Sequence, residues 1–246
     1  MASDTLTTSS SHASLAQRDL RLALIGLLLL LGWDASGLDL PLVRLFGSAQ
    51  GFAWRDHWLT ARLLHDGGRL LSVALFALTL AASLRPFGPW RGLARRERLW
   101  WLGVTVSCLI LIPLLKRLSA TSCPSQLQEF GGMAHYVSHW QFSWTAAGTG
   151  GDGGPGHCFP SGHASGAFSF LAIGFALLRL HPQQARAWLA MLTLLGLVFG
   201  LAQMARGAHY LSHTLYTAWL CWSLTALSWH ALKARRFSLP LPTPAA

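Results

Sequence analysis

Three short polar clusters interrupt an otherwise apolar sequence, and each contains residues that could bind or transfer a charged group. Two histidines from separate clusters could supply a nucleophile and a general acid. A lysine and an arginine could bind an oxyanion, and a guanidinium fork matches phosphate oxygens. This combination favours chemistry on a phosphoryl group. The clusters are Lys116-Arg117 with Cys123-Pro124, Pro160-Ser161-Gly162-His163, and the stretch from Arg206 through His209 to His213.

The second cluster stands where a predicted helix begins. Amide groups and the positive end of the helix dipole attract an anion at such a place. Gly162 has no side chain and lets the backbone approach an oxygen closely. We therefore expect Ser161 and Gly162, together with Lys116 and Arg206, to bind a phosphate.

Composition limits the class of protein. The chain has 246 residues, of which 52% are hydrophobic and 11% charged. A soluble domain carries about 25% charged residues, so a membrane protein is expected. The formal net charge of +10 would suggest a nucleic-acid partner in a soluble protein. Here many basic residues lie between apolar runs, as the positive-inside rule requires, and nucleic acid is not an expected partner.

Six apolar runs are at or near the length that crosses about 30 Å of hydrocarbon as a helix. The first is short and can be extended by residues 35–38. The sequence predicts an all-α fold, an integral membrane bundle of six transmembrane helices within residues 20–236. A flexible cytoplasmic tail is expected at 1–19 and a second cytoplasmic tail at 237–246. The runs are 22–33, 70–84, 99–115, 164–178, 187–205 and 214–232.

Basic residues gather in alternate links between the runs, at 18–21, 85–98, 179–186 and 233–236. The positive-inside rule makes that side cytoplasmic, with both termini on it. The outer loops are then 34–69, 116–163 and 206–213, and all three polar clusters converge on the outer side. One loop contradicts the rule, because it carries Arg44, Arg55, Arg62 and Arg69 outside. Apolar residues interleave with these arginines, which predicts a helix along the membrane interface.

The motifs resemble those of the type 2 phosphatidic acid phosphatase family, K-x6-R-P, P-S-G-H and S-R-x5-H-x3-D, over roughly residues 99–217. The second motif is matched in full, and Lys116 and His209 match the first and third. The resemblance implies that His209 attacks phosphorus to form a phosphohistidine and that His163 protonates the leaving oxygen. Lys116, Ser161, Gly162 and Arg206 would hold the phosphoryl oxygens. No cofactor and no metal are implied.

The sequence departs from this family pattern at three positions. Cys123 stands in place of the first motif's arginine, and Gln203 in place of the third motif's arginine. Arg206 lies three residues after Gln203, on the same face of a helix, and is expected to substitute for it. His213 occupies the aspartate position. We expect His213 to orient His209 by hydrogen bonding, as a third catalytic residue.

The four cysteines divide into two pairs. Cys108 and Cys221 lie inside predicted spans, where thiols behave as small apolar groups. Cys123 and Cys158 lie in the same outer loop, in the compartment where disulfides persist. Each is next to a motif that must reach the same phosphate. We therefore predict a disulfide between Cys123 and Cys158.

The expected partner is a phosphorylated membrane lipid at the periplasmic face of a bacterial inner membrane. Lipid A, undecaprenyl diphosphate, phosphatidylglycerol phosphate and phosphatidic acid all fit, and the sequence does not choose among them. A metal-dependent membrane hydrolase is one alternative, because His135/His139 and His209/His213 both have the H-x3-H spacing of zinc ligands. A transporter is another, although it needs ionisable groups near mid-membrane, and the predicted spans carry their polar groups at their ends.

Overall fold

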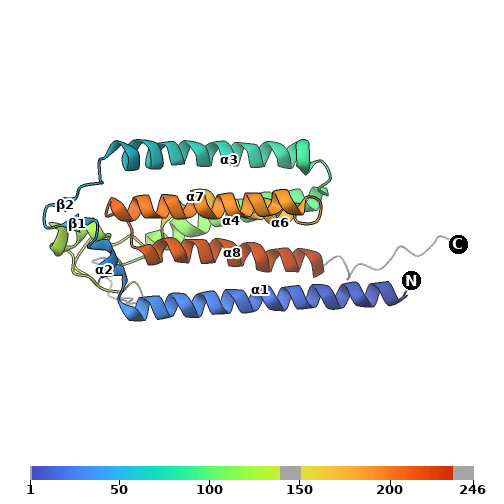
Figure 1. Cartoon of the computed structure of the whole chain (residues 1–246), viewed down its shortest axis with the longest axis horizontal. Helices are drawn as coiled ribbons and strands as arrows, with labels where there is room; N and C mark the ends of the chain where they lie inside the picture. Colours follow the sequence, from blue (N-terminus) through green and yellow to red (C-terminus); the bar gives the residue numbers. More distant parts are fainter. Residues whose placement is uncertain (1, 139–150, 235–246) are drawn as a thin grey trace.

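The structure is a computed structural model that describes residues 2–138 and 151–234, with side chains at 14–138 and 151–233. It is a bundle of long helices with a two-stranded antiparallel sheet at one end (Figure 1). The mostly helical architecture agrees with the expected all-α class.

The long helices begin with α1 (Ala2–Ser36) and end with α8 (Leu211–Ala234). The chain reverses direction from each long helix to the next, so α1, α4 and α7 end where α3, α5 and α8 begin (Figure 1). The intervening elements are α2 (Asp39–Val43), β1 (Gly47–Ser48), β2 (Gly51–Phe52), the π-helix η1 (Leu59–Asp66), α3 (Gly67–Leu84), η2 (Gly88–Trp90), α4 (Arg95–Leu118), η3 (Pro124–Gln126), η4 (Gln128–Phe130), α5 (Gly162–Phe168), α6 (Ala172–Leu177) and α7 (Pro182–Ala205).

Three helices in the described part of the chain are long and apolar enough to cross a membrane. They are the continuous stretch Leu59–Leu84, which joins η1 to α3, and the helices α4 and α7. The stretch Gly162–Leu177 is apolar but shorter. The three long helices contain three of the six predicted apolar runs, and the shorter stretch covers all but the last residue of a fourth.

The helices differ from the predicted runs in three places. α1 extends back to Ala2, so the segment 1–19 that was expected as a tail is helical from its second residue. The last residue of this segment, Asp19, pairs with His230 of α8 at 2.9 Å. The second run begins earlier, at Leu59. The fourth is divided into α5 and α6, because tight turns interrupt the helix. In these turns the Phe170 and Leu171 amides bond carbonyls three residues back.

α5 and α6 form the middle of the bundle, in contact with α4, α7 and α8. Phe168, Phe170 and Leu177 are buried in this core. α5 and α7 approach closely at Gly196, where an added Cβ would lie 2.5 Å from the Phe168 ring. The packing of this core places the start of α5 next to the ends of the helices that surround it, α4, α7 and α8.

A second apolar cluster forms the end of the bundle that carries α2 and the sheet, with Val43, Phe52, Phe130 and Tyr210 among its members. α2 is tied to the beginning of α8 by the buried Asp39. Its carboxylate accepts hydrogen bonds from the Ser212 amide at 3.1 Å and from the Ser212 hydroxyl. The segment before α3 is therefore joined to the stretch that contains the third polar cluster.

Candidate active site

A cavity of about 530 Å³ opens at this end of the bundle, where the three polar clusters meet. Its wall comes from four segments that are distant in sequence. None of the described residues that line it is acidic. The lining residues are Arg55, His65 and Arg69; Lys116, Cys123, Ser125 and Gln126; Gly162 and His163; and Gln203, Arg206, Ala208 and His209.

The second motif lies against the first turns of α8. The Ser161 amide donates to the His213 carbonyl at 3.1 Å, and the Thr217 hydroxyl donates to the Ser161 carbonyl at 3.0 Å. His213 Nδ1 lies 3.1 Å from the Cys158 carbonyl oxygen. These bonds hold the segment before α5 in register with the third motif.

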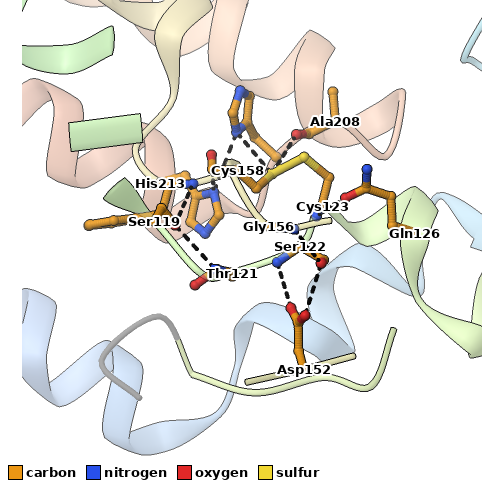
Figure 2. Close-up of a disulfide and its surroundings, with 12 residues drawn as sticks. Ser119, Thr121, Ser122, Cys123, Gln126, Asp152, Gly156, Cys158, Ala208 and His213 are labelled. Carbon is orange, nitrogen blue, oxygen red and sulfur yellow. Dashed lines mark hydrogen bonds between the residues drawn. A yellow bond between two sulfur atoms is a disulfide. The ribbon is translucent and has the colours of Figure 1, made fainter. Parts of the chain in front are cut away.

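A disulfide joins Cys123 to Cys158, with the two Cα atoms 5.2 Å apart, as the sequence predicts (Figure 2). The loop segments that carry the two cysteines are also joined by hydrogen bonds. The Cys158 amide donates to the Thr121 carbonyl at 3.0 Å, and the Ser122 amide donates to the Asp152 carboxylate at 2.6 Å. Asp152, which the sequence analysis did not single out, is buried. The first and second motifs are thus fixed to each other beside the cavity.

His209 lies between α7 and α8 and is 3% exposed. Burial and the nearby Lys116 ammonium lower the pKa of His209 to about 3. The imidazole is therefore neutral at neutral pH, as a nucleophile must be.

The surroundings of the His209 ring favour one tautomer. Its Nδ1 lies 3.6 Å from the Cys158 sulfur, which has no proton because it is in the disulfide. The Cys158 carbonyl also acts as an acceptor towards His209. The Nδ1 atoms of His209 and His213 are 3.4 Å apart, but His213 Nδ1 is already 3.1 Å from the Cys158 carbonyl oxygen. A carbonyl only accepts, so this contact requires a proton on His213 Nδ1. Because the Cys158 carbonyl also accepts from His209, the His209 proton lies on Nδ1 and Nε2 carries none.

His163 is oriented by the segment that precedes α3. Its Nε2 donates to the Leu64 carbonyl at 2.9 Å, and its ring stacks on His65 with centroids 4.9 Å apart. Leu64 belongs to η1, in which a bond runs from the Gly67 amide to the Arg62 carbonyl, five residues back. π-Turns of this kind are frequent at functional sites. An added Cβ at Gly68 would lie 3.0 Å from His163 Nε2, so this position has no room for a side chain.

The cations of the cavity come from several elements. Lys116 is in the last turn of α4, and Arg206 follows the last residue of α7. Arg206 Nε donates to the Arg55 carbonyl at 2.9 Å. Gln203, one turn earlier, lines the same cavity. A guanidinium has five N–H donors, so the bond to Arg55 leaves others for a ligand.

The cavity brings together most of the residues predicted to act on a phosphate. Lys116, Gly162, His163, Arg206 and His209 line it. Two predicted residues, Ser161 and His213, are fully buried behind this lining. The Ser161 amide is bonded to the His213 carbonyl, so the amide that the sequence analysis assigns to phosphate is occupied.

Arg55, His65 and Arg69, which were not among the predicted site residues, also line the cavity. A signal for the two arginines was present in the sequence. They belong to the loop whose arginines depart from the pattern expected under the positive-inside rule, and a binding site for an anion is a second reason for cations in such a loop.

The metal alternative can be tested against the donor atoms. In the described part of the chain, the candidate cluster for a metal ion is Cys158, His209 and His213, with donor atoms within 4.8 Å of one another. Cys158 is in the disulfide, so it offers no thiolate. His135 is not a member of this cluster, and His139 lies outside the described residues. The donor set does not fit the four-histidine zinc site.

The fold and the cavity define a helical protein in which two histidines line a cavity together with several cationic side chains. Residues 98–237, more than half of the chain, match the model of the PAP2 superfamily. The chain therefore belongs to the PAP2 superfamily, whose members are phosphatases that act on phosphoesters. Comparison with curated proteins and with solved structures gave no significant match. The family match begins within α4, so α1 to α3 lie outside it.

Proposed function

We propose that the chain is a six-span membrane phosphatase that removes phosphate from a lipid at the periplasmic face of a bacterial inner membrane. The observation that carries this proposal is the cavity, in which His163 and His209 face cations while no described lining residue is acidic. A phosphate ester is the ligand that this charge and these two histidines fit.

The outer surface of the bundle supports the membrane part of the proposal. Long helices carry large apolar side chains that the protein does not cover, among them Leu29 at 70% exposure, Val73 at 66% and Leu194 at 64%. Exposed apolar surface of this extent is unfavourable in water and is normal next to lipid.

In the proposed reaction the His209 Nε2 lone pair attacks phosphorus, and the bond from phosphorus to the lipid oxygen breaks. His163 gives that oxygen a proton from Nδ1, while the Leu64 carbonyl holds Nε2–H. Water then attacks the phosphohistidine and gives a proton back to His163 as inorganic phosphate leaves. Lys116 and Arg206 neutralise the charge on the phosphoryl oxygens, and Gly162 lets the backbone approach them.

The aspartate of the family pattern is replaced by two groups. The Cys158 carbonyl accepts from the histidines, and His213 stands where the aspartate would be. The Cys158 carbonyl keeps the proton on His209 Nδ1, whereas His213 Nδ1 is itself a donor to that carbonyl, and neither group carries a negative charge to stabilise an imidazolium. We therefore assign His213 a positioning role.

The test measures phosphate release by purified protein from phosphatidic acid, phosphatidylglycerol phosphate, undecaprenyl diphosphate and lipid A. His209→Ala and His163→Ala should each lower the rate at least about 10³-fold. His57→Ala is the control, because this exposed histidine does not line the cavity. Activity should survive a chelator, since no step uses a metal. Inhibition by chelator that zinc reverses would instead support the metal-dependent reading.

His213 is tested separately. His213→Ala should lower kcat about tenfold with little change in KM, because the Cys158 carbonyl still orients His209. His213→Asp should retain activity, since a carboxylate accepts from His209 Nδ1. A His213→Ala enzyme with unchanged kcat would show that the residue has only a packing role.

A further inference from the structure

The family pattern provides two arginines for phosphate that this chain does not have at the matching positions. One is replaced by Cys123, which is in the disulfide and carries no charge. The other is replaced by Gln203. The cavity is nevertheless lined by four basic side chains, those of Lys116, Arg206, Arg55 and Arg69. Arg55 and Arg69 precede residue 98, where the family match begins.

The segment that carries these two arginines is fastened to the site at three places. The Arg55 carbonyl accepts from Arg206 Nε at 2.9 Å, and the Leu64 carbonyl accepts from His163 Nε2 at 2.9 Å. The Phe52 ring packs on Gly207 so closely that an added Cβ would lie 2.4 Å from it. The main chain on either side of Arg55 is therefore held next to residues of the second and third motifs.

Gln203 gives an independent indication of a ligand. The residue is 4% exposed and lines the cavity. Within the described part of the chain, its side-chain Nε2 has no hydrogen-bond partner. An unsatisfied buried donor costs free energy, and an oxygen atom bound in the cavity would satisfy it.

We propose that Arg55 and Arg69, together with the Gln203 amide, bind the phosphoryl oxygens in place of the two family arginines. Arg55 and Arg69 are then part of the active site, although both lie outside the family match. This assignment rests on the proposed function. It also explains why this outer loop carries arginines against the positive-inside rule, because their charge faces a phosphate and not only the membrane surface.

The test compares Arg55→Gln and Arg69→Gln with Arg62→Gln. Arg62 is exposed on the same segment and does not line the cavity, so it is the matched control. Inorganic phosphate is the probe, because its binding can be measured by calorimetry without a lipid substrate. Each of the two variants should weaken phosphate binding at least fivefold and raise KM for the lipid, while Arg62→Gln should change neither. Binding by Arg55→Gln and Arg69→Gln equal to that of Arg62→Gln would overturn the proposal.

A rescue variant guards against an effect of misfolding. Gln203→Arg restores the family's charge, so in the Arg69→Gln background it should recover at least a third of the lost phosphate affinity. No recovery, in a variant whose thermal unfolding midpoint matches the wild type, would argue against a shared role for these positions. The two proposals fail in different ways. If the wild type binds phosphate through the arginines but hydrolyses no lipid in the panel, only the proposed function is lost.

Discussion

The two ends of the bundle treat their charges differently. At the end where α4 begins, the buried Glu97 accepts from Arg179 and Lys233, each at 3.3 Å. Asp19 pairs with His230 at that end in the same way. At the other end, cations line a cavity to which no described acidic residue contributes. Charges that are neutralised within the protein fix helices to one another, whereas a cavity lined by several cations and by no described acidic residue indicates an anionic ligand. The exposed Asp66, which pairs with His65 at 3.0 Å, is not part of that lining.

The strongest test of this contrast removes a cation from the cavity. Lys116→Met should lower kcat/KM by about 10²–10³-fold, or about 3–4 kcal/mol of barrier, because no acidic lining residue depends on it and the transition state does. Arg117→Met is the neighbouring control, since Arg117 is exposed and does not line the cavity. The contrast would break if the two variants had the same steady-state kinetics.

The disulfide between Cys123 and Cys158 is expected to stabilise the end of the bundle that contains the cavity against unfolding. Replacing Cys123 and Cys158 together by Ala should lower the free energy of unfolding by on the order of 3–4 kcal/mol, because the bond closes a loop of 35 residues. Thermal unfolding in detergent measures the change. A reductant should lower the midpoint of the wild type and leave that of the double variant unchanged. Equal midpoints for wild type and variant would mean that the hydrogen bonds alone hold the two motifs.

The opposite end should respond in stability and not in activity. Glu97→Gln removes the negative charge that Arg179 and Lys233 share, and should cost roughly 2–3 kcal/mol while kcat/KM per folded molecule stays the same. Glu129→Gln is the control, because its pair with Arg44 is exposed and contributes little. A loss of activity in Glu97→Gln at full folding would show that the two ends are coupled.

The smallest expected effect is a pH dependence that arises from His209. Its pKa is about 3 when folded and about 6.5 when unfolded. The unfolded state therefore binds more protons between these values, and stability falls as the pH drops below about 6.5. From pH 7 to pH 5 the loss from this group is about 2 kcal/mol at most. His209→Gln should flatten that part of the profile of unfolding midpoint against pH. An unchanged slope would contradict the burial of this imidazole.

Much of the site could be predicted from local sequence. Pro160-Ser161-Gly162-His163 and the stretch around His209 lie at ends of apolar runs, and a chain that alternates direction must bring those ends together. The same reasoning predicted the disulfide that the structure contains. It did not predict that the fourth run would be divided into α5 and α6, because tight turns within an apolar stretch leave no break in hydropathy.

What the sequence by itself determined is the identity of the two histidines, the lysine and the apolar runs that carry them, because each is defined by spacing along one segment. The tertiary structure decided which other groups reach the same cavity. Arg55 and Arg69 are far from the motifs in sequence, and only the contacts of β2 with Gly207 and of η1 with His163 bring them there. The Cys158 and Leu64 carbonyls orient the two histidines, and every residue has a carbonyl. No side-chain pattern could therefore have distinguished them, since a main-chain acceptor acquires its role only from the fold that aims it.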